Sequence, residues 1–219
     1  MTPKYNMTQE QNVFVAKRNM VDYIYNSAKL EGCNVTFPET QTILDGVNVG
    51  SVTLDDIQTV LNLRDAWRFV LYDITTPFDL AYICKINEHV SRNESLQWGV
   101  LRTGQLGISG TDYKPPLPEI TAVNAELEKF ANIENATERA ITVFLWLCRA
   151  QLFWDGNKRT ATICANKILI NAGQGILTIR DADVLEFNKR LLDWYNTGDM
   201  FVIAPWMYDN CIDGIAFTN

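Results

Sequence analysis

Apolar residues recur at helical spacing along most of the chain. Within residues 9–30, Phe14, Val21 and Ile24 fall on one side of a helix, and Gly32 stands where a left-handed residue would end it. We expect one helix with a single buried stripe in this segment.

Three further helix starts are marked by a hydroxyl side chain followed three residues later by a carboxylate, as in an N-terminal capping box. These pairs are Thr36 with Glu39, Thr53 with Asp56, and Thr76 with Asp79. The third pair is expected to open a helix over residues 77–91.

The second half of the chain contains more dense apolar segments. They span residues 118–131, 137–152, 158–172, 181–195 and 200–212. The segment 137–152 is apolar almost all round, which is typical of a helix buried on every side. We therefore expect it at the centre of the core, and a brief β-like run over 176–179.

Residues 101–118 follow a different pattern, because glycines and prolines interrupt them and exclude a long helix. Short extended pieces at 101–103 and 106–109 indicate a β-hairpin. The fold class expected from these patterns is mainly α, with minor β elements.

Composition narrows the range of functions. The 219 residues are 47% hydrophobic, enough to bury the core of one domain, and the formal net charge is −7. No dense cluster of Lys and Arg occurs, so we expect duplex nucleic acid to be repelled.

The start of the chain is polar, and no apolar stretch is long enough to span a bilayer. The five cysteines are far apart and lie mostly in apolar segments, so we expect reduced packing residues. A cytoplasmic protein that contacts no membrane is expected.

Candidate chemistry lies between two of the apolar segments, in the run Phe153-Trp154-Asp155-Gly156-Asn157-Lys158-Arg159. Its polar atoms would sit at a helix N-terminus, where unpaired amides and the helix dipole favour an anion. Asp155 offers the oxygen ligand that Mg²⁺ prefers, and Gly156 lets a backbone approach a ligand closely. Asn157 adds hydrogen-bond donors, and Lys158 and Arg159 add positive charge. The run alone leaves open a plain turn followed by a solvated helical turn.

Residues 151–160 resemble the Fic-family motif His-x-Phe-x-Asp/Glu-Gly-Asn-Gly/Lys-Arg, with Gln151 in the place of the histidine. Two other segments are similar to family motifs. The run Tyr113-Lys114-Pro115-Pro116 looks like the exit of the family's flap, and Ser27-Ala28-Lys29-Leu30-Glu31-Gly32 is similar to its inhibitory motif. We divide the chain accordingly into an N-terminal segment with an inhibitory helix, 1–35, and a Fic-like domain, 36–219.

The resemblance implies a Fic-type helical bundle with a small β-hairpin flap. Fic enzymes bind ATP with a divalent metal and transfer AMP to a hydroxyl of a target protein. For this chain the resemblance implies that Asp155 holds Mg²⁺ and that the phosphates contact Gly156, Asn157, Lys158 and Arg159. The flap residues Leu106, Gly107 and Ile108 would pair with an extended target segment by strand addition.

The resemblance also implies auto-inhibition by Glu31, which would displace the γ-phosphate by pairing with an arginine. Ser27 and Glu31 are four residues apart and share a helix face, and Gly32 follows them. The family's usual partner is a second arginine, but that position is Thr162 here, so Arg159 must serve. An ordinary solvated helix end is the plain alternative for this segment.

Gln151 is the largest departure from the motif. An amide does not titrate near neutral pH, so it cannot take up a proton as imidazole can. General base catalysis contributes roughly 10²- to 10⁴-fold in rate, or about 3 to 5 kcal/mol. The only histidine, His89, lies in another helix and is not expected to replace it.

Two functions therefore stay open from the sequence. One is a degenerate protein adenylyltransferase that binds ATP and Mg²⁺ and is auto-inhibited. The alternative is a catalytically dead nucleotide-binding or protein-interaction module. A homo-oligomer is possible in either case.

Overall fold

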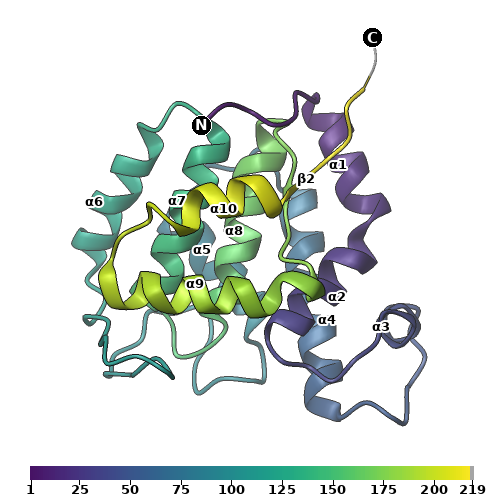
Figure 1. The fold of residues 1–219 in the computed structure, drawn as a ribbon. Coiled ribbons are helices and arrows are strands. Elements are labelled where there is room, and N and C mark those ends of the chain that lie inside the picture. Colours follow the sequence, from purple (N-terminus) through teal and green to yellow (C-terminus); the bar gives the residue numbers. More distant parts are fainter. Residues whose placement is uncertain (218–219) are drawn as a thin grey trace.

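The computed structural model describes residues 1–217 as ten α-helices with short connections and a small sheet (Figure 1). The helices of the first half are α1 (Gln9–Arg18), α2 (Met20–Leu30), α3 (Phe37–Leu44), α4 (Leu54–Tyr72) and α5 (Leu80–Val90). Those of the second half are α6 (Ile120–Ala131), α7 (Ala136–Ala150), α8 (Asn157–Asn171), α9 (Val184–Thr197), preceded by a 3₁₀ turn at Asp181–Asp183, and α10 (Ile203–Asn210). The mainly α prediction is confirmed.

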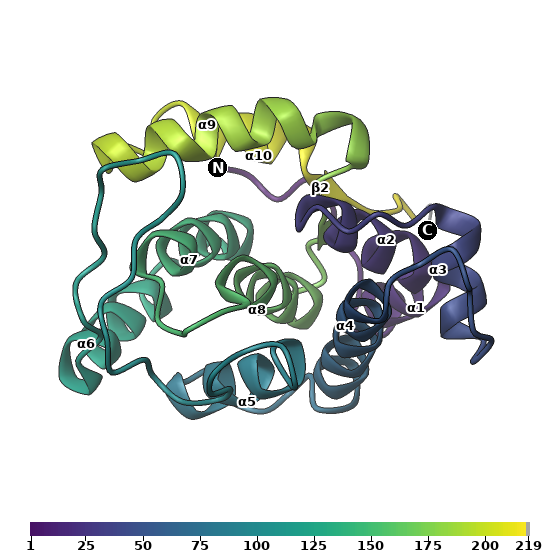
Figure 2. The same ribbon diagram turned by 90° about the horizontal axis from the view of Figure 1, so that it is seen from below.

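The pair α7 and α8 lies at the centre of the bundle. In Figure 2, α9 and α10 cover one side of this pair and α5 covers the opposite side, while α6 and α4 lie at its two edges. All residues of α8 except Lys158 and Asn171 are buried. The expectation that the segment 137–152 lies in the core is confirmed, because nine residues of α7 are buried as well.

The N-terminal segment forms two helices where we expected one. Asn19 separates α1 from α2 with φ −107° and ψ 16°. Asparagine competes with the helical backbone for hydrogen bonds and is a poor helix-interior residue, which accounts for the break. Gly32 ends the second helix as predicted, with a left-handed φ of 85°.

Two of the three predicted helix caps are confirmed. The hydroxyl groups of Thr36 and Thr53 accept hydrogen bonds from backbone N–H groups at the starts of α3 and α4. The prediction for Thr76 is wrong, because Asp79 caps α5 by accepting from the N–H of Tyr82 at 2.8 Å. The helix therefore starts at Leu80, three residues after the predicted start at residue 77.

The sheet is not in the flap. Residues 1–217 contain only β1 (Ile176–Leu177) and β2 (Ile212–Asp213), which pair antiparallel. The expected hairpin in residues 101–118, with its extended pieces at 101–103 and 106–109, does not form.

Hydrogen bonds of Arg102, one of them to the loop after α7, take the place of the expected hairpin. The N–H of Arg102 donates to the carbonyl of Leu152 at 3.0 Å. The Arg102 guanidinium donates to the carbonyls of Gly104 and Pro116. These bonds of Arg102 hold the flap without a strand pair between residues 101–103 and 106–109.

Two further findings concern the chain as a whole. Within residues 1–217, no helix combines the length and the apolar character that a bilayer crossing requires. All five cysteines are free, and all but Cys84 are buried.

Residues of α2 such as Tyr23 and Ile24 pack into the same core as α4, so the division at residues 35 and 36 stays a prediction.

Candidate functional site

The loop between α7 and α8 is shaped by its own side chains. Gln151 ends α7 in a left-handed conformation, with φ 46° and ψ 60°. The side-chain oxygen of Asn157 accepts from the N–H of Phe153 at 2.9 Å, and its amide group donates to the carbonyl of Phe153 at 2.8 Å. The loop is therefore closed by the first residue of α8.

Gly156 lies directly against the C-terminal end of α5. A Cβ atom at this position would stand 2.2 Å from Oγ of Ser91, and φ is 70°. The carbonyl of Asp155 accepts hydrogen bonds from Ser91 Oγ and from Nδ2 of Asn87, both at 3.0 Å. This backbone position therefore requires glycine.

The N-terminus of α8 has no side-chain cap. The N–H of Thr160 makes the first helical hydrogen bond, to the carbonyl of Gly156 at 2.8 Å. The N–H groups of the preceding helical residues have no partner within the helix, as at every helix start. Together with the helix dipole they favour an anion in front of the loop.

A cleft of about 430 Å³ opens in front of this loop. It is lined by Glu31, Ile108, Ser109, Gly110, Gln151, Trp154, Asp155, Gly156, Asn157, Lys158, Asn188, Leu191, Leu192 and Tyr195. The residues come from four places that are distant in sequence, namely the end of α2, the flap, the loop before α8 and the inner face of α9. Most of the residues that the sequence singles out therefore meet in one cavity.

Some predicted residues lie beside the cleft and do not line it. Arg159 is buried behind the loop, with 4% of its surface exposed. Ser27 is buried one turn before Glu31, whose N–H donates to the Ser27 carbonyl at 3.3 Å, and Gly32 ends that helix. In the flap, Leu106 is half-buried and Gly107 is exposed.

Arg159 is the electrostatic centre of the site. Its guanidinium forms ion pairs with Glu94 and, at 3.5 Å, with Asp155. It also donates a hydrogen bond to the carbonyl of Val90 at 3.1 Å. Burial lowers the pKa of Arg159, but the carboxylates of Glu31, Glu94 and Asp155 outweigh burial and raise it. The guanidinium is therefore a permanent positive charge under the loop.

Glu31 reaches into the cleft from the end of α2. Its carboxylate lies 3.7 Å from Nζ of Lys158 and 3.7 Å from Nε of Arg159. Both contacts are ion pairs whose lengths exceed that of a hydrogen bond. Glu31 Oε1 and Arg159 Nε are buried and have no hydrogen-bond partner. Thr162 adds no charge, because its hydroxyl donates to the carbonyl of Lys158 at 3.0 Å.

Gln151 uses both ends of its amide within the protein. Nε2 donates to the carbonyl of Cys148 at 2.7 Å, and Oε1 accepts from Nδ2 of Asn157 at 3.1 Å. Its backbone carbonyl accepts from Nε of Arg102 at 2.6 Å. Gln151 is thus held by hydrogen bonds at the edge of the cleft.

The sequence motifs do not point to the cleft residues of α9. Asn188 and Tyr195 reach the cleft from α9, and their only signal was the amphipathic pattern of that helix. Trp154 packs against Gly104 of the flap, where a Cβ atom would stand 2.5 Å from the indole ring. His89 lies outside the cleft and stacks on Phe69, with ring centroids 5.0 Å apart.

No group of three or more His, Cys, Asp or Glu side chains arranged to hold a metal occurs among residues 1–217. Asp155 offers one half-exposed carboxylate at the cleft. Mg²⁺ is commonly held by one or two carboxylates together with substrate phosphates, so this donor set fits an ion that arrives with a nucleotide.

Comparison with known proteins finds one matching family model and several proteins of similar sequence. The Fic/DOC family model matches residues 77–169. Protein adenylyltransferase Fic of Nematostella vectensis is 29% identical over 195 residues, which cover 84% of this chain and 45% of that protein. The protein of the same name from Drosophila yakuba is 23% identical over 167 residues, which cover 72% of this chain and 33% of that protein. The chain therefore spans between a third and a half of the length of these relatives.

Two solved structures share the fold. A fragment of Fic-1 from C. elegans aligns with a TM-score of 0.77 at 20% identity, over 90% of this chain and 62% of that chain. The BepC protein of Bartonella tribocorum with bound AMPPNP aligns with a TM-score of 0.50 at 16% identity, over 70% of this chain and 86% of that chain.

Proposed function

We propose that the chain is a Fic/DOC-domain protein, a nucleotide-binding relative of the protein adenylyltransferases whose AMP transfer to a protein hydroxyl is weakened by Gln151. The observation that carries this proposal is the cleft in which Glu31, Gln151 and residues 155–158 meet. Its cofactors would be ATP and Mg²⁺.

Nucleotide binding is supported by the donors around the loop. The open N–H groups of α8, the Lys158 ammonium and the buried Arg159 guanidinium all lie within or directly behind the cleft. An Mg²⁺ ion carried by the nucleotide would take Asp155 as its protein ligand and neutralise phosphate charge. BepC, which shares the fold, holds an ATP analogue.

Auto-inhibition is supported by the position of Glu31. The carboxylate already occupies the space beside Lys158 and Arg159 where a terminal phosphate would compete for the same two cations. The 3.7 Å separations describe a contact that a phosphate can displace. We propose that Glu31 lowers the affinity for ATP by competing with the phosphate for these two cations, while the cleft stays open to the nucleotide.

Target docking would use the outer edge of the flap. Gly107 is exposed, and Ile108 borders the cleft next to Gln151. The flap forms no strand pair within residues 1–217, so an extended segment of a target protein could add to Leu106, Gly107 and Ile108. A hydroxyl on that segment would then lie near the loop.

A second function, a catalytically dead nucleotide-binding module, is favoured by one observation. Both polar ends of the Gln151 amide are bonded inside the loop, to Cys148 and Asn157. Gln151 therefore contributes structure at a position where a transferase needs a proton acceptor. In that case the nucleotide controls how the flap engages a partner.

A pair of variants separates the two functions. Gln151→His restores an imidazole, and Gln151→His with Glu31→Gly also removes the inhibitory carboxylate. Both are incubated with ATP labelled on the α-phosphate, Mg²⁺ and a cell lysate, beside the unmodified protein. A degenerate transferase predicts that labelling of protein hydroxyls rises roughly 10²- to 10⁴-fold in the double variant.

Calorimetric titration of the unmodified protein with ATP and Mg²⁺ completes the test. Heat of binding without transfer by any variant supports the dead module. Absence of both binding and labelling contradicts the proposed function in either form. Glu134→Gly, at an exposed position outside the cleft, is the matched control for removing a glutamate.

A further inference from the structure

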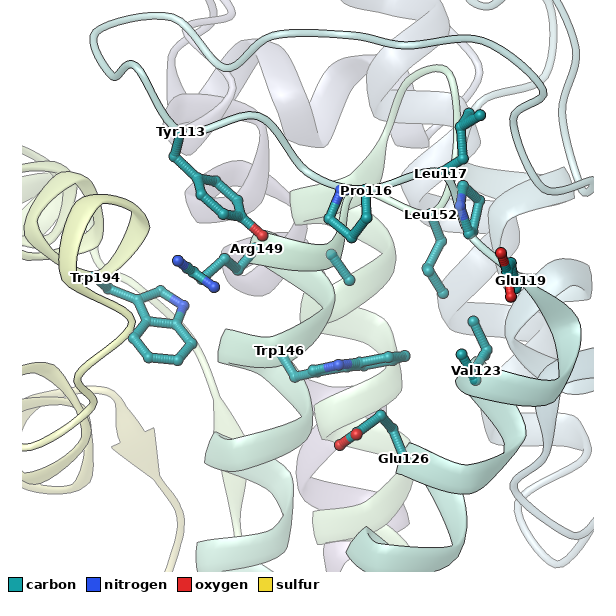
Figure 3. A pocket seen from close by; sticks show the side chains of 13 residues that line it. Tyr113, Pro116, Leu117, Glu119, Val123, Glu126, Trp146, Arg149, Leu152 and Trp194 are labelled. Atoms are coloured by element: carbon teal, nitrogen blue, oxygen red, sulfur yellow. The ribbon is translucent and has the colours of Figure 1, made fainter.

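A second pocket of about 250 Å³ lies next to the cleft, between the flap exit, α6 and α7 (Figure 3). Ligands of drug size occupy roughly 300–1,000 Å³, so this pocket suits a single side chain. Nothing in residues 1–217 fills it.

The pocket and the cleft are bordered by adjacent residues in two places. On the α7 end, Gln151 faces the cleft while its neighbour Leu152 faces the pocket. On α9, Tyr195 faces the cleft and Trp194 faces the pocket. A segment that follows the flap from one cavity therefore reaches the other within a few residues.

The chemistry of the pocket is apolar at its centre and acidic along α6. Figure 3 shows the indole of Trp146 crossing the middle of the pocket, with Leu152 and Val123 beside it and Glu126 below. Glu119, Val123 and Glu126 lie on one face of the helix start, at spacings of four and three residues.

Both carboxylates are available for a cation. Glu119 has no ion pair among residues 1–217. Glu126 pairs only with Lys129, at 2.7 Å and with 68% of the lysine side chain exposed. An exposed pair of this kind contributes little and exchanges readily.

Arg149 closes the opposite wall and does not compete for the centre. Its guanidinium lies 3.8 Å from the ring centroid of Tyr113 and 5.4 Å from that of Trp194. Its Nε donates to the carbonyl of Tyr195 at 3.2 Å. In Figure 3 it lies on the Trp194 side, across the pocket from Glu119.

We propose that this pocket receives an arginine or lysine side chain of the protein segment that docks beside the cleft. The aliphatic stem would lie along Trp146 and Val123, and the cationic head would meet the indole face and the carboxylates of Glu119 and Glu126. The inference rests on the proposed docking of a target protein at the flap.

Tryptophan indole signals in a ¹H–¹⁵N spectrum test the proposal, because each cavity holds its own reporter. Trp146 reports on the pocket and Trp154 on the cleft, and Trp146→Phe and Trp154→Phe assign the two signals. N-acetyl-arginine methylamide is titrated beside N-acetyl-norleucine methylamide, which has an uncharged stem, and N-acetyl-glutamate methylamide.

If the pocket binds a cationic side chain, the arginine probe should shift the Trp146 signal and leave the Trp154 signal unchanged. Affinity should fall about three- to tenfold in the double variant Glu119→Gln, Glu126→Gln, whose carboxylates lie on the surface. Equal shifts with the norleucine probe, stronger shifts with the glutamate probe, or full affinity in the double variant each overturn it. ATP with Mg²⁺ should move Trp154, so a failure of nucleotide binding is seen separately.

Discussion

The side-chain amide of Asn157 donates to Oε1 of Gln151 at 3.1 Å, across the mouth of the loop that joins α7 to α8. The same Asn157 side chain holds the backbone of Phe153 through two further hydrogen bonds. Gln151 is therefore part of the network that shapes the proposed phosphate site.

Asn157→Ala should loosen this loop. The side chain is buried and makes three hydrogen bonds, and each lost bond typically costs about 0.5–1.5 kcal/mol. We expect the free energy of unfolding to fall by about 2–4 kcal/mol in urea denaturation, together with weaker binding of ATP and Mg²⁺. Asn188→Ala, an exposed cleft residue on α9, is the control and should keep its stability. Equal stability of the two variants would contradict the role of Asn157.

Glu31 and Glu94 approach Arg159 from two sides, and their removal should have different effects. Glu31 lies in the cleft, so Glu31→Gln should raise the affinity for ATP and Mg²⁺ by roughly tenfold, or about 1.4 kcal/mol. Glu94 lies outside the cleft and also accepts a hydrogen bond from Asn62 at 2.8 Å. Glu94→Gln should therefore destabilise the fold without raising affinity. Calorimetry and urea denaturation of both variants decide, and a similar gain in affinity from both would refute an inhibitory role specific to Glu31.

Gly156→Ala should be poorly tolerated. The new Cβ would stand 2.2 Å from Ser91 Oγ and 2.8 Å from Val90 Cγ1, at a φ of 70°. Left-handed strain and overpacking together predict a loss of about 2–4 kcal/mol in unfolding free energy. The double variant Gly156→Ala, Ser91→Ala should recover only part of it, because Val90 and the backbone strain remain.

Gly107→Ala is the matched control in the flap, since no atom lies within 4 Å of the added Cβ. It should change the melting temperature little. If Gly107→Ala destabilises the protein as much as Gly156→Ala does, the close packing of the loop against α5 is not the cause.

Much of the bundle could be read from local patterns. The caps at Thr36 and Thr53 and the left-handed stop at Gly32 depend on side chains and backbone within a few residues. The break at Asn19 and the shifted start at Asp79 were missed, because a single residue decides between competing local hydrogen bonds. The hairpin was wrong for a different reason, since Arg102 ties the flap to a loop 49 residues away.

The site was predictable where chemistry is concentrated in a short run. Residues 155–159 carry the polar groups of the loop, and Glu31 carries the carboxylate that is proposed to be inhibitory. Asn188 and Tyr195 could not be found this way, because each is one polar or aromatic position on an amphipathic helix, and only the packing of α9 brings them to the cleft. Long-range packing therefore supplies the wall that local sequence does not encode.

Lys167 should give the protein a measurable pH dependence away from the site. Its side chain is buried, and Nζ donates to the backbone carbonyls of Asp73 and Ile74. Burial lowers the pKa of Lys167 to about 8, with the Asp73 carboxylate opposing that shift. An unfolded lysine titrates near 10.4.

Between these two pKa values the unfolded chain holds a proton that the folded chain has released, so the contribution of Lys167 to stability rises with pH. Buried thiols act in the opposite direction, since burial raises the pKa of Cys33 to about 12 and stability is lost as unfolded thiols ionise. The comparison must therefore be a difference between two proteins with the same cysteines.

Lys167→Met supplies that difference. It removes the titrating group and leaves two carbonyls without a donor, a cost that does not vary with pH. The unfolding free energy of the unmodified protein minus that of the variant should grow by about 2 kcal/mol from pH 7.5 to pH 10, measured by urea denaturation at each pH. A difference that stays constant across this range would show that the Lys167 ammonium keeps its proton in the folded protein, and that its carbonyl partners and the Tyr82 ring 5.0 Å away compensate for burial.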